Sequence, residues 1–164
     1  MKELLVSYAS YNYWANQKLI EKILSLTEEN QHAEIKSSFS SLFSTILHMW
    51  DAESIWWQRM KMHETIVVPS LTFHPTTQEA ATGLLKQNKD WHEWAEQASA
   101  LQLEHEFSYQ NSKKEKFRQP VWQMLTHLFN HGTFHRGQLV TILRQLGEDK
   151  IPQTDYIHYS RTRK

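Results

Sequence analysis

The sequence contains no cysteine among its 164 residues, which excludes a disulfide framework, thiolate metal ligands and a cysteine nucleophile. Glycine and proline are also scarce, at four residues each, so a turn-rich β-sandwich or barrel is disfavoured. No apolar run approaches the roughly 18–20 residues that a membrane-spanning helix needs. The apolar character of the N-terminus ends within a few residues, so it does not resemble a signal peptide. We therefore expect long regular elements, no membrane partner and, by default, a cytoplasmic location.

An excess of positive charge is missing as well. Eighteen basic residues balance eighteen acidic ones, whereas a domain that grips nucleic acid normally carries a basic surplus. The short basic cluster of Lys113, Lys114 and Lys116 falls in a predicted turn and is interpreted as a solvated loop. Nucleic acid is therefore not an expected partner.

What the chain does have is aromatic bulk and histidine. Aromatic residues make up 12% of it, with seven tryptophans, which disfavours disorder. The length fits one domain, residues 1–164, with a sizeable core. Ten histidines are the compositional outlier, and the functional site is expected among them.

Helical periodicity dominates the apolar pattern. Apolar residues recur at three- and four-residue steps and predict helices over about 2–26, 38–63, 76–100 and 120–146. Residues 67–75 are expected to be extended or looped, and residues 103–117 to form a short hairpin or irregular crossover. The tail from 148 to 164 is expected to lie extended on the surface of a bundle spanning about 2–147. The predicted fold is an all-α four-helix bundle, because bundling buries four amphipathic stripes most simply.

Three histidines in the last predicted helix are spaced four residues apart. Two imidazoles at i and i+4 share a helix face and can reach one metal ion. At about 100° per residue, His131 and His135 turn toward the apolar stripe, whereas His127 falls at its boundary. Gly132 is expected to leave room for the site, and it also replaces the general-base glutamate of a His-Glu-x-x-His protease.

A third ligand is available from the second predicted helix. His48 lies midway along it, beside a face of small residues that suggests a cavity; these are Ser41, Ser44, Thr45 and Ala52. On an antiparallel neighbour, His48 would face His131 and His135. Three neutral imidazoles with open positions are typical of a catalytic or Lewis-acid metal site rather than a closed structural one.

Two polar residues are candidates for a supporting role. Asp51 lies about 60° around the helix from His48 and could orient that imidazole. Gln138 follows His135 by three residues and could contact substrate, metal-bound water or a ligand. Glu53 points further away and is interpreted as an interhelical contact.

These residues resemble the DinB/YfiT-like family over nearly the whole chain. The similar motifs are Tyr11-x-x-Trp14-Ala15-Asn16, His48 with Ala52-Glu53 and Trp56, Asn130-His131-x-x-x-His135-Arg136-Gly137-Gln138, and Pro152-x-x-Asp155-x-x-x-Tyr159. The resemblance implies an up-down-down-up bundle, usually a homodimer, that binds a divalent metal, typically zinc or nickel. Carried over by motif, the ligands are His48, His131 and His135. Some relatives are thiol-dependent S-transferases or isomerases that use bacillithiol, mycothiol or glutathione.

The leading hypothesis is a metal-dependent S-transferase that joins a small-molecule thiol to a small electrophile. A coordinated thiol loses its proton, which supplies a nucleophile without a protein base. Two alternatives stay open: hydrolysis by metal-activated water, and a non-catalytic, dimeric metal-binding protein of the stress response.

A homodimer is also predicted from the adjacent pair Trp56 and Trp57. Neighbouring side chains diverge by about 100° on a helix, so both cannot enter one bundle core. We expect one of them to be exposed or to be covered by a second copy.

Overall fold

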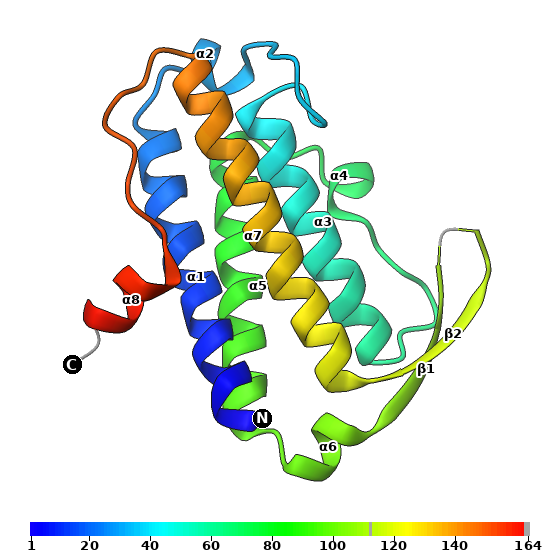
Figure 1. Cartoon of the computed structure of the whole chain (residues 1–164). Helices are drawn as coiled ribbons and strands as arrows, with labels where there is room; N and C mark the ends of the chain where they lie inside the picture. Colours follow the sequence, from blue (N-terminus) through cyan, green and yellow to red (C-terminus); the bar gives the residue numbers. More distant parts are fainter. Residues whose placement is uncertain (112, 163–164) are drawn as a thin grey trace.

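Four long helices form the body of the protein in a computed structural model that describes residues 1–111 and 113–162. They are α1 (Lys2–Leu24), α3 (Leu42–Met60), α5 (Thr77–Gln97) and α7 (Val121–Gln145). Figure 1 shows that α1 and α7 run upward while α3 and α5 run downward, which gives the up-down-down-up order. Both α5 and α7 pack against α1 and α3, so α3 and α7 are antiparallel neighbours. The predicted helical bundle is confirmed.

Shorter elements connect the long helices. They are α2 (Glu28–His32), α4 (Pro69–Thr72), α6 (Ala100–Glu104), β1 (Glu106–Gln110), β2 (Lys116–Pro120) and α8 (Tyr156–Thr162). The strands pair antiparallel, with Ser108 opposite Arg118, so the hairpin alternative predicted before the last long helix is correct. No helix in the described part of the chain is long and apolar enough to cross a membrane.

The predicted start of α3 at residue 38 is wrong. Ser41 is the N-cap, and its hydroxyl accepts from the amide of Ser44 while the Ser44 hydroxyl accepts from the amide of Ser41. This reciprocal cap satisfies two donors that would otherwise have no partner, and it fixes the helix start at Leu42. The small side chains of Ser41 and Ser44 thus cap a helix instead of lining a cavity. Residues 33–41 are left to form a loop.

The C-terminal tail was predicted to be extended, and this prediction is wrong for part of it. It ends in α8, whose Tyr159 is buried against Tyr11 and Trp14 of α1. Tyr156 lies one turn earlier on the same helix face and contacts Tyr11 as well. Packing of these rings explains a helix that periodicity over so few residues does not reveal. Residues 163–164 lie outside the described part.

The apolar core is divided in two by a layer of buried polar side chains. One apolar cluster surrounds Trp91, Leu125 and Phe129 at the hairpin end, and the other surrounds Leu19 and Ile46 at the opposite end. The polar layer between them consists of Asn12, Asn16, Glu53, Asn88 and Arg136. The candidate histidines lie at nearly the same level of the bundle, between α3 and α7.

Trp56 and Trp57 diverge as predicted, but both are covered within one chain. Trp57 packs edge-on against Trp91 in the core, with ring centroids 4.9 Å apart. Trp56 turns outward and packs against Tyr109 of the hairpin, with ring centroids 4.8 Å apart. The hairpin supplies the cover that had been assigned to a second copy, so the homodimer stays a prediction that needs other grounds.

Candidate metal centre

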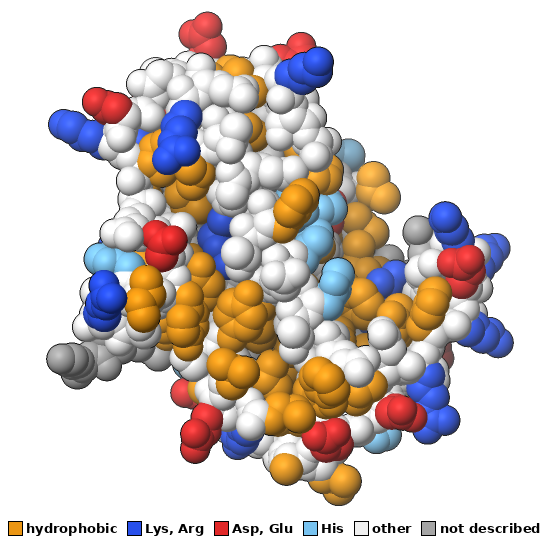
Figure 2. Space-filling model, in the orientation of Figure 1, with side chains coloured by type: hydrophobic (Ala, Val, Ile, Leu, Met, Phe, Trp, Pro, Cys, Tyr) orange, Lys and Arg blue, Asp and Glu red, His pale blue; other side chains and the backbone are white. Residues whose placement is uncertain are grey.

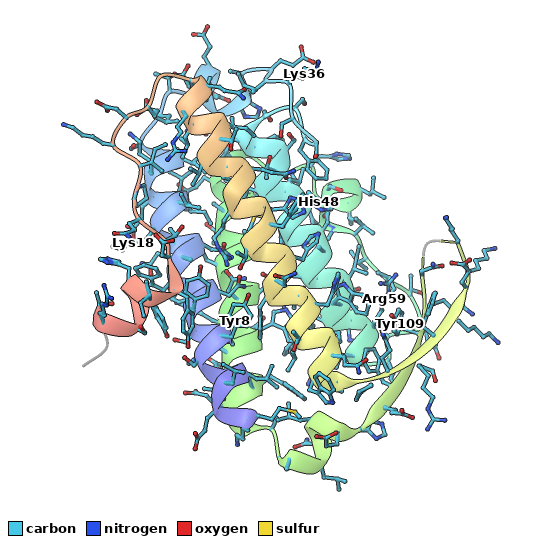
Figure 3. All side chains as sticks on the ribbon, viewed as in Figure 1. Tyr8, Lys18, Lys36, His48, Arg59 and Tyr109 are labelled. Atoms are coloured by element: carbon cyan, nitrogen blue, oxygen red, sulfur yellow. The ribbon has the colours of Figure 1, made fainter. Side chains whose placement is uncertain are left out.

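The imidazoles of His48, His131 and His135 converge between α3 and α7. The Nε2 atom of His131 lies 3.3 Å from that of His48 and 3.0 Å from that of His135. One nitrogen from each of the three rings lies within 4.8 Å of the others, a grouping that could hold a metal ion. Figure 3 shows the labelled His48 pointing from α3 toward α7. The structure therefore brings together the three histidines that the sequence singled out.

Helical phase decides which of the three α7 histidines take part. His135 is buried, His131 is partly buried and His127 is exposed, in the order that the helical geometry predicted. The ring of His127 lies 5.9 Å from that of His131 and 5.7 Å from that of Trp56, so it borders the centre without joining it. The boundary position of His127 is the predicted one, and its contact with Trp56 is the part that the sequence did not reveal.

Burial keeps the three candidate ligands neutral. Desolvation, followed by the neighbouring histidines, lowers the pKa of His131 to about 4. Desolvation also lowers the pKa of His48 and of His135. A neutral imidazole carries a free lone pair, which is the form that binds metal.

Gln138 sets the orientation of His135. Its side-chain carbonyl lies 2.7 Å from Nδ1 of His135, and its amide donates to the hydroxyl of Ser38 at 2.9 Å. A carbonyl oxygen can only accept, so Nδ1 of His135 must donate and Nε2 is left free to face the centre. Of the roles considered for Gln138, the geometry supports that of a partner to the ligand.

Asp51 was expected to orient His48, but its carboxylate bonds elsewhere. Its carboxylate accepts from the backbone amide of Ser70 at 2.9 Å and so anchors the short helix α4 against α3. Its charge raises the pKa of His48, but by less than desolvation and His135 lower it. The sequence spacing placed Asp51 close to the ligand but could not reveal the competing amide donor from the loop.

Phe39 is part of the site and was missed by the sequence analysis. Its ring stacks on His48 with centroids 4.1 Å apart and meets His135 edge-on at 5.6 Å. With Ser38, it lies in the loop before α3 that folds over the centre. Placing the helix start at residue 38 concealed this contact; the capping pattern of Ser41 and Ser44 was the signal that could have exposed it.

Gly132 makes room for a neighbour other than a metal. A Cβ atom at this position would lie 2.6 Å from Oδ1 of Asn12 and 3.1 Å from Nη1 of Arg136. The expectation that Gly132 opens the histidine site is therefore wrong, because the glycine faces α1 and the buried polar layer.

That polar layer is a closed ring of hydrogen bonds joining all four long helices. Nη1 of Arg136 donates to Asn12 at 2.6 Å and to Asn16 at 3.0 Å. Asn12 then donates to Glu53 at 3.0 Å, while Asn16 donates to Asn88, which donates to the other oxygen of Glu53. Arg136 can only donate, so both branches run toward the carboxylate and fix the orientation of every amide. The interhelical role inferred for Glu53 is observed.

The four helices and the converging imidazoles define a helical bundle with a three-histidine centre. The chain belongs to the DinB family, whose family model matches residues 1–164. It is similar to the protein named Protein DinB from Bacillus subtilis (strain 168), with 28% identity over 174 residues. That match covers 95% of this chain and 93% of the relative.

Proposed function

We propose that this protein binds a divalent metal ion through His48, His131 and His135 and uses it to transfer a small-molecule thiol to a small electrophile. The convergence of three Nε2 atoms from two antiparallel helices carries the proposal. Three neutral imidazoles suit zinc or nickel, and these metals are the expected occupants. A cytoplasmic location and the absence of nucleic-acid and membrane partners belong to the same proposal.

The surrounding residues fit such a centre. Gln138 holds His135 in one tautomer, and Phe39 covers the ring of His48. A divalent ion held by three imidazoles lowers the pKa of a thiol that takes an open position. The chain would orient the ligands and shield the thiolate from water.

The acidic side chains beside His48 are engaged in other contacts and do not supply a base to the centre. Asp51 is engaged by the amide of Ser70, and Glu53 lies in the buried polar ring. Neither a coordinated thiol nor a coordinated water requires such a base, because coordination to a metal lowers the pKa of both and deprotonates the thiol outright. The hydrolase stays the second candidate enzyme and the non-catalytic metal-binding protein the third.

Metal content of single variants tests the centre. We expect alanine at position 48, 131 or 135 to abolish stoichiometric zinc or nickel after dialysis, because two ligands hold a labile ion poorly. His127→Ala is the matched control and is expected to keep the metal. Circular dichroism checks that each variant folds, and metal retention in His135→Ala with its loss in His127→Ala would contradict the assigned ligands.

Cobalt substitution tests the thiol. Addition of a low-molecular-weight thiol to the Co²⁺-loaded protein is expected to produce a sulfur-to-cobalt absorption band. An alcohol of the same size serves as the control. An unchanged spectrum with several thiols, in a protein shown to hold cobalt, would contradict S-transfer and leave metal binding intact.

A further inference from the structure

A groove lies between the C-terminal half of α3, the loop that follows it and the β1–β2 hairpin. Its volume is about 940 Å³, within the range of small-molecule sites. Ile55 and Arg59 of α3, Ile66 and Val68 of the loop, and Tyr109 of the hairpin contribute to its walls. Figure 2 shows a hollow between the hairpin and the body of the molecule, on the face where histidine side chains are exposed.

Arg59 is held in this groove by aromatic rings. Its guanidinium carbon lies 4.9 Å from the centre of the Trp56 ring and 5.6 Å from that of Tyr109. Figure 3 shows the labelled Arg59 and Tyr109 side by side between α3 and the hairpin. Stacking on aromatic faces positions a guanidinium and leaves its N–H donors directed outward.

No carboxylate neutralises this guanidinium among the residues that the structure describes. Glu64 also lines the groove but makes no ion pair with Arg59. The nearby Arg118 forms an ion pair with Glu106 at 2.8 Å. Within residues 1–111 and 113–162, no hydrogen bond or ion pair engages the Arg59 side chain. A half-buried, prepositioned cation without an anion is suited to receive one from a ligand.

A row of aromatic ring contacts leads from the Trp56 ring beside Arg59 to the histidine centre. The ring of Trp56 lies 5.7 Å from that of His127, which lies 5.9 Å from that of His131. Trp56 follows His48 by eight residues, about 12 Å along the helix axis. A ligand that lies over these rings would reach from the centre to the Arg59 guanidinium.

We infer that Arg59 binds a carboxylate of the small molecule that occupies this groove, with Trp56 and Tyr109 as positioning residues. The expectation that the same molecule carries a thiol, bound at the histidine centre, rests on the proposed function. The expected ligand is a small-molecule thiol that also carries a carboxylate. The planar fork of arginine matches a carboxylate with two parallel hydrogen bonds.

Metal-free protein and a thiol-blocked probe test Arg59 separately from the metal. The probe is S-methylglutathione, which keeps two carboxylates and cannot coordinate as a thiolate. Binding is followed by NMR through the indole N–H signal of Trp56, assigned from its loss in Trp56→Phe. We expect a titratable shift with the probe in wild type and none with its diethyl ester, which lacks both carboxylates.

The variants then identify the cation. Arg59→Gln is expected to weaken probe binding at least tenfold, since a charge-assisted hydrogen bond contributes about 1.5–3 kcal/mol. Arg59→Lys keeps the positive charge but loses the planar guanidinium, and its affinity for the probe is expected to lie between those of wild type and Arg59→Gln. Lys61→Gln is the matched control, because Lys61 lies over the Trp57 ring at the same end of α3, outside this groove, and its Kd is expected to change less than twofold.

Equal binding by wild type and Arg59→Gln would overturn the inference, as would failure of the probe to bind wild type at millimolar concentration. Binding of inorganic phosphate in place of the probe would overturn the carboxylate assignment. If Arg59→Gln fails to fold, the tenfold criterion passes to Arg59→Met, and Arg59→Lys must still bind more tightly. None of these outcomes depends on metal. Failure of the proposed function is detected by the cobalt spectra, so the two failures can be distinguished.

Discussion

At the scale of single residues, the candidate metal centre includes side chains that orient its histidines as well as the histidines themselves. Gln138 links His135 of α7 to Ser38 of the loop before α3, so one amide fixes both a ring and the segment that covers it. Partners of this kind are worth 10–100-fold in metal affinity in other metalloproteins.

Replacement of Gln138 by alanine should therefore weaken metal binding 10–100-fold while the fold is kept. The affinity is measured by competition with a chromophoric chelator. Thr141→Ala, an exposed change one turn further along α7, is the control and should leave the affinity unchanged. An unchanged affinity in Gln138→Ala would mean that packing alone orients His135.

Glu53 gives the stability a specific pH dependence. Burial raises its pKa from 4.5 to about 7, against the opposing hydrogen bonds of Asn12 and Asn88 and the charge of Arg136. The folded state thus binds this proton more tightly than the unfolded state. The stabilisation is complete below about pH 4.5 and is lost as the pH rises through about 7.

The advantage in unfolding free energy of wild type over Glu53→Gln should accordingly shrink between about pH 4.5 and 7, then level off. Urea unfolding of both proteins without metal, across this pH range, measures the difference in unfolding free energy. The histidines are the same in both proteins, so their titration cancels in the difference. An advantage that grows with pH would show instead that Arg136 holds the carboxylate ionised and its pKa low.

At the scale of elements, helix pairing uses glycine in two opposite ways. A Cβ atom on Gly83 of α5 would lie 2.4 Å from the ring of Trp50, so the glycine permits close packing of α5 on α3. Gly137 of α7 has no atom within 4 Å of the corresponding position and is exposed. Only the first glycine is required by packing.

Gly83→Ala should lower the free energy of unfolding by about 1–3 kcal/mol, the usual cost of overpacking. Gly137→Ala should raise it by up to about 1 kcal/mol, because alanine favours a helix interior. Urea denaturation gives both values. A cost that persists when Trp50 is first replaced by leucine would contradict the steric explanation.

At the scale of the whole molecule, a homodimer remains a prediction, and an exposed apolar surface suggests its location. Leu4 at the start of α1 is 65% exposed and lines a hollow together with Tyr156 of α8, and the next residue, Ile157, is 57% exposed. Figure 2 shows apolar side chains gathered over this N-terminal part of the bundle. A second copy of this chain would cover them.

Sedimentation should then give a mass near twice 19.6 kDa at micromolar concentration. Glutamate at both Leu4 and Ile157 should yield the monomer, while Leu101→Glu, at an apolar position on α6 that is 80% exposed, should leave the dimer intact. A wild-type mass near 19.6 kDa would exclude a stable homodimer.

The sequence by itself determined the four long helices and the histidine cluster, because both follow from local periodicity. A 3.6-residue repeat places His131 and His135 on one face whatever surrounds them. His48 was selected for its position midway along a second helix, beside small residues. Family motifs agreed with that choice.

Only the tertiary structure decided what each supporting side chain contacts. Asp51 bonds to Ser70 and Gly132 accommodates Asn12, because in each case a segment distant in sequence supplies the partner. The groove at Arg59 has the same origin, since Tyr109 of the hairpin comes fifty residues later. Periodicity reports which way a residue faces on its own helix, and only packing decides what it meets there.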